Sequence, residues 1–222
     1  MNYEVFRILE RAEVDHIVRD LGRRTFVDGK LTARGGAQEI KHNLQARPAE
    51  SEQAELENSI IAALGRNAGF QSFALPKCYV MPIFSRYEVG MKYGAHVDNS
   101  LMGGLHGVRT DLAVTIFLSP PSSYDGGELV IEASAGEEQI KLDCGEAIVY
   151  SASSIHYVAP VTRGVRLAAV VWLQSVVGDE RLRAILHDLF WIMNHSEADK
   201  NSRASLLLTK SYHNLLRYAA EP

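Results

Sequence analysis

The sequence predicts a mainly β fold with helical additions, and three observations lead to this class. Between residues 77 and 173, about eight short apolar runs alternate with clusters of Gly, Pro, Ser and Asp, which is typical of a β-sandwich or barrel. No long stretch with helical periodicity separates these runs, which disfavours a parallel sheet built from βαβ units. Helical periodicity occurs instead before residue 67 and after residue 178.

The N-terminal region, residues 1–76, is expected to contain helices and a loop that pack on the β core. Residues 10–21 and 50–66 both place apolar side chains at helical spacing, the second stretch after Pro48. Between them, residues 26–47 are polar, contain several glycines and show little periodicity. They predict a long loop or short strands, and long loops in compact domains are often functional.

Residues 77–177 are expected to form the β domain. Its predicted strands are Lys77–Phe84, Arg86–Val89, Thr110–Leu118, Glu128–Glu132, Glu138–Leu142, Ala147–Tyr150, Ile155–Ala159 and Val165–Leu173. Residues 178–222 are expected to form a C-terminal helical subdomain, with one apolar stripe on Leu182, Ile185, Leu186 and Leu189, and another over residues 202–219. These stripes are expected to pack on the β domain or on another subunit, which leaves a homo-oligomer open.

Composition and charge argue against several classes of protein. The net charge of −4 gives no basic footprint for nucleic acid, and no apolar run approaches the ~20 residues that span a bilayer. The N-terminus lacks the features of a signal peptide. Cys78 and Cys144 lie far apart and form no C-x-x-C pair, so a disulfide framework is not expected. Together these features predict a cytoplasmic location.

The chemistry centres on Tyr93-Gly94-Ala95-His96-Val97-Asp98, which follows a run with strand character. Side chains at i and i+2 on a strand share a face, so His96 and Asp98 could bind one metal ion. A His-x-Asp pair is common by chance and needs a third ligand. His156 is the expected third ligand because it lies on a predicted strand of the same β region. His16, His187, His195 and His213 lie in or next to helical stretches, whereas His42 and His106 lie in loops.

Two His and one carboxylate form the facial triad of non-haem Fe(II) oxygenases, but a catalytic zinc site can use the same residues. Arg166 follows His156 by ten residues, and a hairpin would place it on the neighbouring strand. Its apolar neighbours suggest a buried guanidinium, which suits bidentate capture of a carboxylate. A structural ion pair is the alternative.

At this point the sequence resembles a known family. The order and spacing of these residues are similar to those of the Fe(II)/2-oxoglutarate-dependent dioxygenases, in the prolyl/lysyl hydroxylase-like branch and its bacterial PKHD-type hydroxylases. The resemblance covers nearly the whole chain and is carried by Val27–Thr32, Arg86–Asp98, Arg109–Leu112, Ser123–Leu129, His156, Pro160–Arg166 and Tyr212–Arg217.

The resemblance implies a double-stranded β-helix, or jelly roll, with Fe(II) bound by His96, Asp98 and His156. It implies that Arg166 holds the distal carboxylate of 2-oxoglutarate, with the Tyr87 hydroxyl as a helper, although Tyr87 could equally be a core aromatic. Trp172 falls where relatives have an aromatic residue in the pocket, and core packing explains it as well. The loops 27–47 and 99–109 are candidate lids.

The implied activity is O₂-dependent hydroxylation of an unidentified small-molecule or peptidyl substrate, coupled to decarboxylation of 2-oxoglutarate to succinate and CO₂. The family is also described as binding L-ascorbate, and relatives associated with iron uptake suggest a siderophore-linked role. Two alternatives stay open at this point. One is a non-redox, cupin-like jelly roll that binds a metal or small molecule, and the other is a zinc hydrolase.

Overall fold

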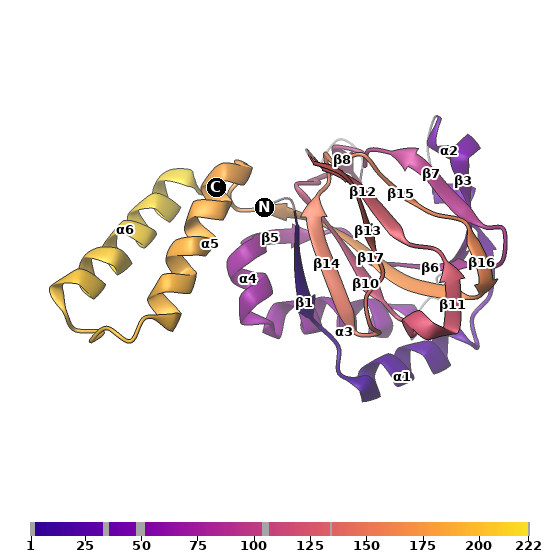
Figure 1. The fold of residues 1–222 in the computed structure, drawn as a ribbon, viewed down its shortest axis with the longest axis horizontal. Coiled ribbons are helices and arrows are strands. Elements are labelled where there is room, and N and C mark those ends of the chain that lie inside the picture. Colours follow the sequence, from indigo (N-terminus) through magenta and orange to yellow (C-terminus); the bar gives the residue numbers. More distant parts are fainter. Residues whose placement is uncertain (1–2, 33–35, 48–51, 104–106, 134, 222) are drawn as a thin grey trace.

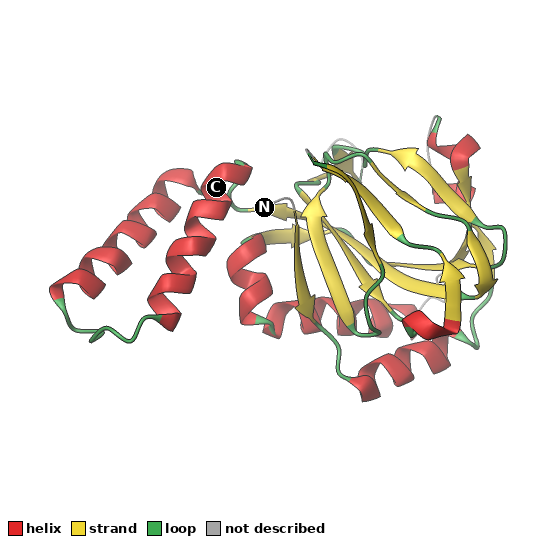
Figure 2. Cartoon of the chain, in the orientation of Figure 1, coloured by secondary structure: helices red, strands yellow, loops and turns green. Residues whose placement is uncertain are grey.

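The chain folds into two facing antiparallel sheets with helices packed outside them (Figures 1 and 2). The computed structural model describes residues 3–32, 36–47, 52–103, 107–133 and 135–221. The N-terminal region contains β1 (Tyr3–Arg7), α1 (Arg11–Leu21), β2 (Phe26–Asp28), η1 (Gly29–Thr32), α2 (Ala37–Ile40), β3 (Lys41–His42), β4 (Leu44–Ala46), α3 (Glu52–Arg66) and α4 (Ala68–Ala74).

The rest of the chain supplies most of the strands and a C-terminal pair of helices. Its elements are β5 (Pro76–Tyr79), β6 (Ile83–Tyr87), β7 (Lys92–His96), β8 (Leu101–Met102), β9 (Val108–Arg109), β10 (Leu112–Phe117), η3 (Pro121–Ser123), β11 (Tyr124–Gly126), β12 (Leu129–Ala133), β13 (Gly136–Ile140), β14 (Glu146–Ser151), β15 (His156–Val158), β16 (Val161–Gly164), β17 (Arg166–Ser175), α5 (Glu180–His195) and α6 (Arg203–Ala219).

The larger sheet has the strand order β1-β14-β10-β17-β6-β4-β2, and β5 also pairs with β17. The smaller sheet has the order β13-β12-β15-β7-β3, and two short ribbons, β11-β16 and β8-β9, complete the β structure of the described residues. This arrangement confirms the mainly β fold with helical additions that the sequence predicts.

Strand β10 shows how the layers are built, because it is buried along its whole length. Leu112, Val114 and Ile116 pack in the core between the larger sheet and helices α1, α3 and α4. Ala113 and Phe117 point the other way, into the core between the two sheets. Covering both faces of a strand replaces the alternation of polar and apolar residues with a continuous apolar run.

Several elements differ from the sequence-based expectation. The run Lys77–Phe84 is two strands, β5 and β6, because both pair along the ten-residue strand β17 and the chain breaks pairing around Pro82, which has no N–H to donate. Residues 26–47 form short strands and helical turns, and β1 and α4 are elements that the sequence pattern did not predict. Helix α4 starts at Asn67, whose side chain accepts a hydrogen bond from the Phe70 backbone N–H at 2.8 Å, only one residue after α3 ends.

Helices α5 and α6 pack against each other and extend away from the sheets (Figure 1). Val177, Leu186 and Tyr212 form the buried centre of this helical hairpin. Ile185, which belongs to the predicted apolar stripe, is 46% exposed and lies on the outer surface of the hairpin, and packing of this stripe on another subunit stays a prediction. Other large apolar side chains exposed there are Trp191, Ile192, Leu206, Leu207 and Tyr218.

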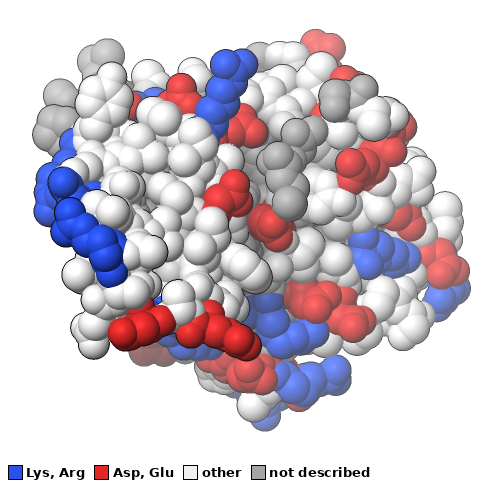
Figure 3. All heavy atoms as spheres, turned by 60° about the vertical axis from the view of Figure 1, so that its left-hand side comes forward, with Lys and Arg blue, Asp and Glu red and all other residues white. Residues whose placement is uncertain are grey.

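Acidic and basic side chains are interspersed over the face shown in Figure 3, with broad uncharged areas between them. Cys78 and Cys144 are free thiols. None of the helices in the described part of the chain has the length and apolar character needed to cross a membrane. The predicted division of the chain into an N-terminal region (1–76), a β domain (77–177) and a C-terminal helical subdomain (178–222) stays a prediction.

Candidate metal centre and binding pocket

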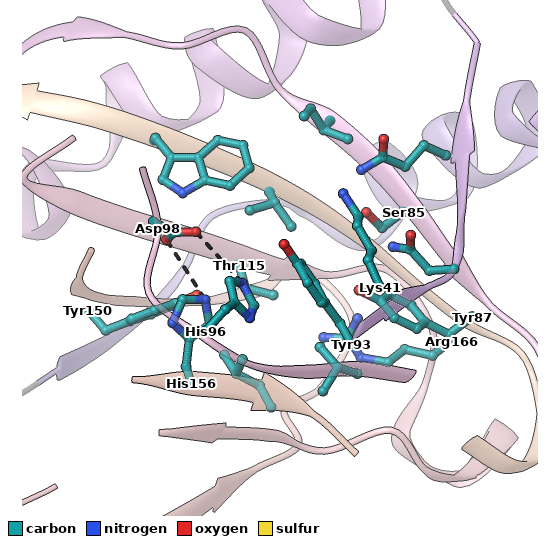
Figure 4. A pocket seen from close by; sticks show the side chains of 17 residues that line it. Lys41, Ser85, Tyr87, Tyr93, His96, Asp98, Thr115, Tyr150, His156 and Arg166 are labelled. Carbon is teal, nitrogen blue, oxygen red and sulfur yellow. Dashed lines mark ion pairs between the residues drawn. The ribbon is translucent and has the colours of Figure 1, made fainter. Parts of the chain in front are cut away.

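His96, Asp98 and His156 come together at one end of the smaller sheet. His96 ends β7 and His156 begins β15, and their Cα atoms are directly paired across the two antiparallel strands. The Nε2 atoms of His96 and His156 lie 3.9 and 3.8 Å from the two carboxylate oxygens of Asp98 (Figure 4). Asp98 stands two residues beyond the end of β7, so the expectation that it shares a strand face with His96 is wrong. The turn after β7 brings its carboxylate to the same place.

Backbone carbonyls fix the orientation of both imidazoles. His96 Nδ1 lies 2.8 Å from the carbonyl oxygen of Gly94, and His156 Nδ1 lies 3.0 Å from that of Ser154. A carbonyl oxygen only accepts, so each Nδ1 must carry the proton and donate it. Each Nε2 therefore keeps its lone pair, and these lone pairs are the ones near Asp98. Such hydrogen bonds orient imidazoles that ligate metals.

The protonation of this group suits a cation. Burial, with the neighbouring His156 adding to it, lowers the pKa of His96 to about 4, so this imidazole is neutral at neutral pH. Burial raises the pKa of Asp98, and one of its oxygens, Oδ2, is buried without a hydrogen-bond partner among the described residues. A metal ion would satisfy that oxygen. Two nitrogen donors and one oxygen donor fit a first-row divalent metal such as Fe(II), and zinc as well.

Arg166 lies at the other end of the pocket, on the larger sheet. It is 1% exposed, and its Cα is paired with that of Tyr87 across β17 and β6. The expected hairpin next to His156 is wrong, because Val161–Gly164 forms a separate strand, β16, that pairs with β11 and carries the chain across to the other sheet. Arg166 therefore faces the His-Asp-His group from the opposite sheet.

The guanidinium of Arg166 is held by aromatic rings and lacks a carboxylate. Its Cζ lies 5.2 Å from the centre of the Tyr87 ring and 5.3 Å from that of Phe117. No salt bridge within the described chain involves Arg166, and its Nε and Nη2 atoms are buried without hydrogen-bond partners. The alternative of a structural ion pair thus finds no support here. A buried cation with unmet donors is a site for an anionic ligand.

Two tyrosines flank this guanidinium. Tyr87 is buried in the pocket wall, and burial raises the pKa of its hydroxyl, while nearby Arg166 and Asn43 oppose that rise. Tyr124 is also buried, its hydroxyl has no partner in the described structure, and its pKa is raised by burial. Tyr124 was missed from sequence because it stands in a short strand, β11, far from the other site residues along the chain. Gly127 leaves room here, since a Cβ would come within 3.1 Å of the Arg166 Cδ.

One pocket joins the two ends (Figure 4). Trp172 lines it, and the indole Nε1 is buried without a partner among the described residues, which favours a pocket role over simple core packing. Lys41, Asn43 and Gln45 line a wall that sequence reasoning missed. The sequence offers no signal for them, because Lys41, His42 and Asn43 are consecutive polar residues without strand-like alternation.

The remaining candidates lie elsewhere. His42 is exposed on β3 and does not line the pocket, and His187 forms a 3.2 Å contact from Nδ1 to the Ser72 hydroxyl, between α5 and α4. His106 lies outside the described residues. The candidate lid 99–109 begins and ends as a ribbon in which β8 pairs with β9. Movement of either candidate lid stays a prediction.

Comparison with known proteins places these features in context. The family model described as "2OG-Fe(II) oxygenase superfamily" matches residues 82–174, which include His96, Asp98, His156 and Arg166. A PKHD-type hydroxylase from Synechococcus sp. (strain JA-2-3B'a(2-13)) is 44% identical over 216 residues, covering 96% of each chain.

Solved structures with the same fold are much more distant in sequence. A prolyl hydroxylase from Trichoplax adhaerens, in complex with a hypoxia inducible factor peptide fragment, matches with a TM-score of 0.57 at 15% identity, covering 83% of this chain and 86% of its own. A viral collagen prolyl hydroxylase from Paramecium Bursaria Chlorella virus-1, described as a 2OG complex, gives 0.56 at 18% identity, covering 79% and 97%. These likenesses confirm the jelly-roll core.

Proposed function

Since this chain belongs to the PKHD-type hydroxylases of the 2OG-Fe(II) oxygenase superfamily, we propose that His96, Asp98 and His156 hold its Fe(II). The enzyme is a dioxygenase that uses Fe(II), 2-oxoglutarate and O₂. When bound, the iron supplies the oxidising chemistry, and the chain supplies position and protection from water. Support for the ligand set comes from the two oriented Nε2 lone pairs and the unpartnered oxygen of Asp98.

Arg166 is the proposed anchor for the distal carboxylate of 2-oxoglutarate, and the Tyr87 hydroxyl is its helper. The observation that carries this proposal is a fully buried guanidinium without a carboxylate partner among the described residues, facing the His-Asp-His group across one pocket. A planar guanidinium binds a carboxylate through two parallel hydrogen bonds, which fixes the direction of the bound acid as well as its place.

The finer chemistry is also part of the proposal. Hydroxylation of the primary substrate is coupled to decarboxylation of 2-oxoglutarate to succinate and CO₂. L-ascorbate keeps the iron reduced, and a role in iron uptake or siderophore-linked metabolism follows from the family resemblance. The substrate is a small molecule or a peptidyl group, and the cytoplasmic location stays a prediction.

The test begins with anaerobic Fe(II) and 2-oxoglutarate, whose complex gives a weak visible charge-transfer band. His96→Ala and Asp98→Ala should lose both this band and O₂-dependent succinate formation, because each removes one of three metal ligands. Substantial succinate formation by either variant would sink the ligand assignment.

Arg166→Ala should raise the 2-oxoglutarate concentration needed for half-maximal band intensity by roughly thirtyfold or more, because a buried charged partner is removed. Arg163→Ala is the matched control, since Arg163 lies three residues away but is paired with Asp125 on the surface. Equal titration curves for the two variants would place the anchor elsewhere.

Tyr87→Phe separates a co-substrate contact from core packing. Removing only the hydroxyl should raise the 2-oxoglutarate requirement by about tenfold, the effect of losing one hydrogen bond to a charged group, and should leave the thermal midpoint nearly unchanged. An unchanged titration would show that Tyr87 is a core aromatic.

The two competing functions find less support. A non-redox, cupin-like binder has no use for Arg166 opposite the metal group. A zinc hydrolase needs a general base beside the metal-bound water, yet Asp98 is the only carboxylate among the described residues that line the pocket.

A further inference from the structure

Tyr124 is a fully buried tyrosine beside Arg166, and the proposed function gives it no role. It is 0% exposed and does not line the pocket, whereas Arg166 does. The two side chains lie side by side, because a Cβ added to Gly127 would lie 3.2 Å from the Tyr124 Cε2 and 3.1 Å from the Arg166 Cδ. Tyr124 therefore supports the guanidinium from outside the set of residues that face the pocket.

The pairing of two short strands explains this position. Strands β11 and β16 form a ribbon in which Tyr124 is the direct Cα partner of Gly164, and Arg166 begins β17 two residues later. The two backbones come so close that a Cβ added to Gly164 would lie 3.0 Å from the Tyr124 Cα. The ribbon thus brings Tyr124 to the start of the strand that carries Arg166.

Lys141 holds Tyr124 in place. Its Nζ lies 4.1 Å from the centre of the Tyr124 ring and donates hydrogen bonds to the carbonyl oxygens of Tyr124, at 2.9 Å, and Gly126, at 3.3 Å. A carboxylate oxygen of Glu128 lies 3.7 Å from the same Nζ and balances its charge. Because Lys141 contacts both the ring and the backbone of Tyr124, the hydroxyl has little freedom to turn away from Arg166.

The Tyr124 hydroxyl and the Arg166 guanidinium act on each other. Burial raises the pKa of Tyr124, while Arg166 opposes that rise through its charge and as a hydrogen-bond donor, and Glu128 adds to it. Because the pKa stays above its ordinary value, the hydroxyl is neutral at physiological pH. Within the described chain, neither this hydroxyl nor the Nε and Nη2 atoms of Arg166 have a hydrogen bond to a third group.

A neutral acceptor suits this place better than a carboxylate would. A guanidinium has five N–H donors, and a bound carboxylate takes two of them along one edge. The N–H groups on the other edges stay buried and need an acceptor, because an unmade buried hydrogen bond is costly. An Asp or Glu would accept these bonds but would also neutralise the charge that attracts the ligand. A tyrosine hydroxyl accepts a hydrogen bond and leaves that charge intact.

We propose that Tyr124 is a positioning residue for Arg166. Its hydroxyl accepts a hydrogen bond from the guanidinium and thereby directs the free edge of the guanidinium toward the distal carboxylate of 2-oxoglutarate. This inference rests on the proposed function of Arg166 and adds a residue that touches neither the metal nor the co-substrate. Loss of the hydroxyl should therefore weaken only those ligands that carry a carboxylate at the Arg166 end.

The experiment follows the charge-transfer band of the full-length chain with Fe(II) under anaerobic conditions. It compares 2-oxoglutarate with 2-oxobutanoate, which has the same keto acid end but lacks the distal carboxylate. Tyr124→Phe should raise the half-saturating concentration of 2-oxoglutarate about tenfold, because a hydrogen bond to a charged group is lost. The value for 2-oxobutanoate should stay within about twofold of wild type. A merely structural role of the hydroxyl would weaken both ligands by the same factor.

Tyr79→Phe is the matched control. The Tyr79 hydroxyl accepts a 3.3 Å hydrogen bond from the Gln71 amide in the core between the larger sheet and the helices, and Tyr79 does not line the pocket. This variant should bind both ligands like wild type. A second measurement repeats Tyr124→Phe in an Arg166→Ala background, where it should have no further effect on 2-oxoglutarate, because both substitutions act through one interaction. This comparison remains decisive if Tyr124→Phe lowers the thermal midpoint.

The titrations also separate failure of this inference from failure of the proposed function. The inference is wrong, while the proposed function stands, if Tyr124→Phe leaves the 2-oxoglutarate titration unchanged, weakens both ligands equally, or has its full effect in the Arg166→Ala background. If Arg166→Ala weakens 2-oxoglutarate no more than 2-oxobutanoate, the anchor is elsewhere and the inference is wrong with it. A wild-type chain that forms no 2-oxoglutarate complex would overturn the proposed function itself.

Discussion

At the residue scale, the metal group depends on the backbone as much as on its side chains. The carbonyls of Gly94 and Ser154 each hold the Nδ1 proton of the histidine two residues later. Both imidazoles thereby present Nε2 to the same carboxylate, that of Asp98, while Tyr93 stacks on the His96 ring and Tyr150 contacts the His156 ring edge to face. A substitution that turns the carbonyl of residue 94 or 154 would therefore change the orientation of the imidazole, and with it metal binding.

Depression of the His96 pKa predicts a specific acid sensitivity of the metal-free protein. Between the ordinary His pKa near 6.5 and the folded value of about 4, the unfolded chain binds more protons than the folded chain. Stability therefore falls as pH falls through this window. From about pH 7.5 to about pH 4.5, wild type should lose ~2 kcal/mol more unfolding free energy than His96→Gln in urea titrations. Parallel pH profiles for the two proteins would contradict a buried neutral His96.

Sequence reasoning succeeds at this scale where a residue's chemistry is rare and its spacing is fixed. His96, Asp98, His156 and Arg166, all named from the sequence, line one pocket, and His156 and Arg166 gave the pattern the specificity that the common His-x-Asp pair lacks. Lys41 was missed, since a lysine in a polar stretch is normally solvated. Its burial results from the pairing of β3 with β7, which no local pattern encodes.

At the element scale, the contact between α2–β3 and β7 shapes the pocket wall. Gly94 permits it, because any larger residue would meet Ile40. The same contact brings Lys41 over the Tyr93 ring. The position of Lys41 on β3 thus depends on the absence of a side chain at Gly94 on β7.

Gly94→Ala should destabilise the chain by about 1–3 kcal/mol, the usual cost of overpacking. The added Cβ would lie 2.8 Å from the Ile40 Cβ, and the short segment α2–β3 must move to relieve it. Gly65→Ala is the control, because nothing lies within 4 Å of its added Cβ in helix α3, and it should be neutral or stabilising by about 0.5–1 kcal/mol. Urea unfolding measures both, and the cost of Gly94→Ala should shrink in an Ile40→Gly background.

The fold class was predictable because strands and helices occupy separate parts of the chain, each with its own period. The boundaries were less so. Arg166 was expected beside His156, but Thr162-Arg163-Gly164, which looks like a turn, is part of strand β16 and redirects the chain to the opposite sheet. Turn-prone residues do not specify which strand the following residues pair with. The sheet that a strand joins is decided by tertiary contacts.

At the scale of the whole molecule, the helical hairpin is joined to the sheets by a small polar network. Arg109 forms two hydrogen bonds to Asp111 and one to Glu221 beyond the end of α6. Asp111 also accepts the backbone N–H of Ser175 at 2.8 Å, at the end of β17. Glu221, just beyond α6, is therefore held beside the β8–β9 ribbon. The oligomeric state stays a prediction.

Asp111→Ala should cost about 1.5–3 kcal/mol, because it leaves the buried backbone N–H of Ser175 without its acceptor and removes two of the hydrogen bonds of Arg109. Glu221→Gln should cost at most about 1 kcal/mol, since its partner Arg109 is partly exposed and water screens the pair. Hydrogen exchange should show faster opening across β17 and α5 in the first variant, and only at the end of α6 in the second. The reverse order would place the main attachment at the C-terminus.

Because the metal group and Arg166 lie on opposite sheets, the spacing between the sheets sets the length of co-substrate that can reach both. The core between the sheets, which includes Phe117, Ile148 and Leu129, sets the separation of the metal group from Arg166. Protein cores resist compression, so this separation cannot adjust to a longer or shorter diacid. The enzyme should then discriminate keto diacids by carbon number, with oxaloacetate too short and 2-oxoadipate too long to satisfy both ends.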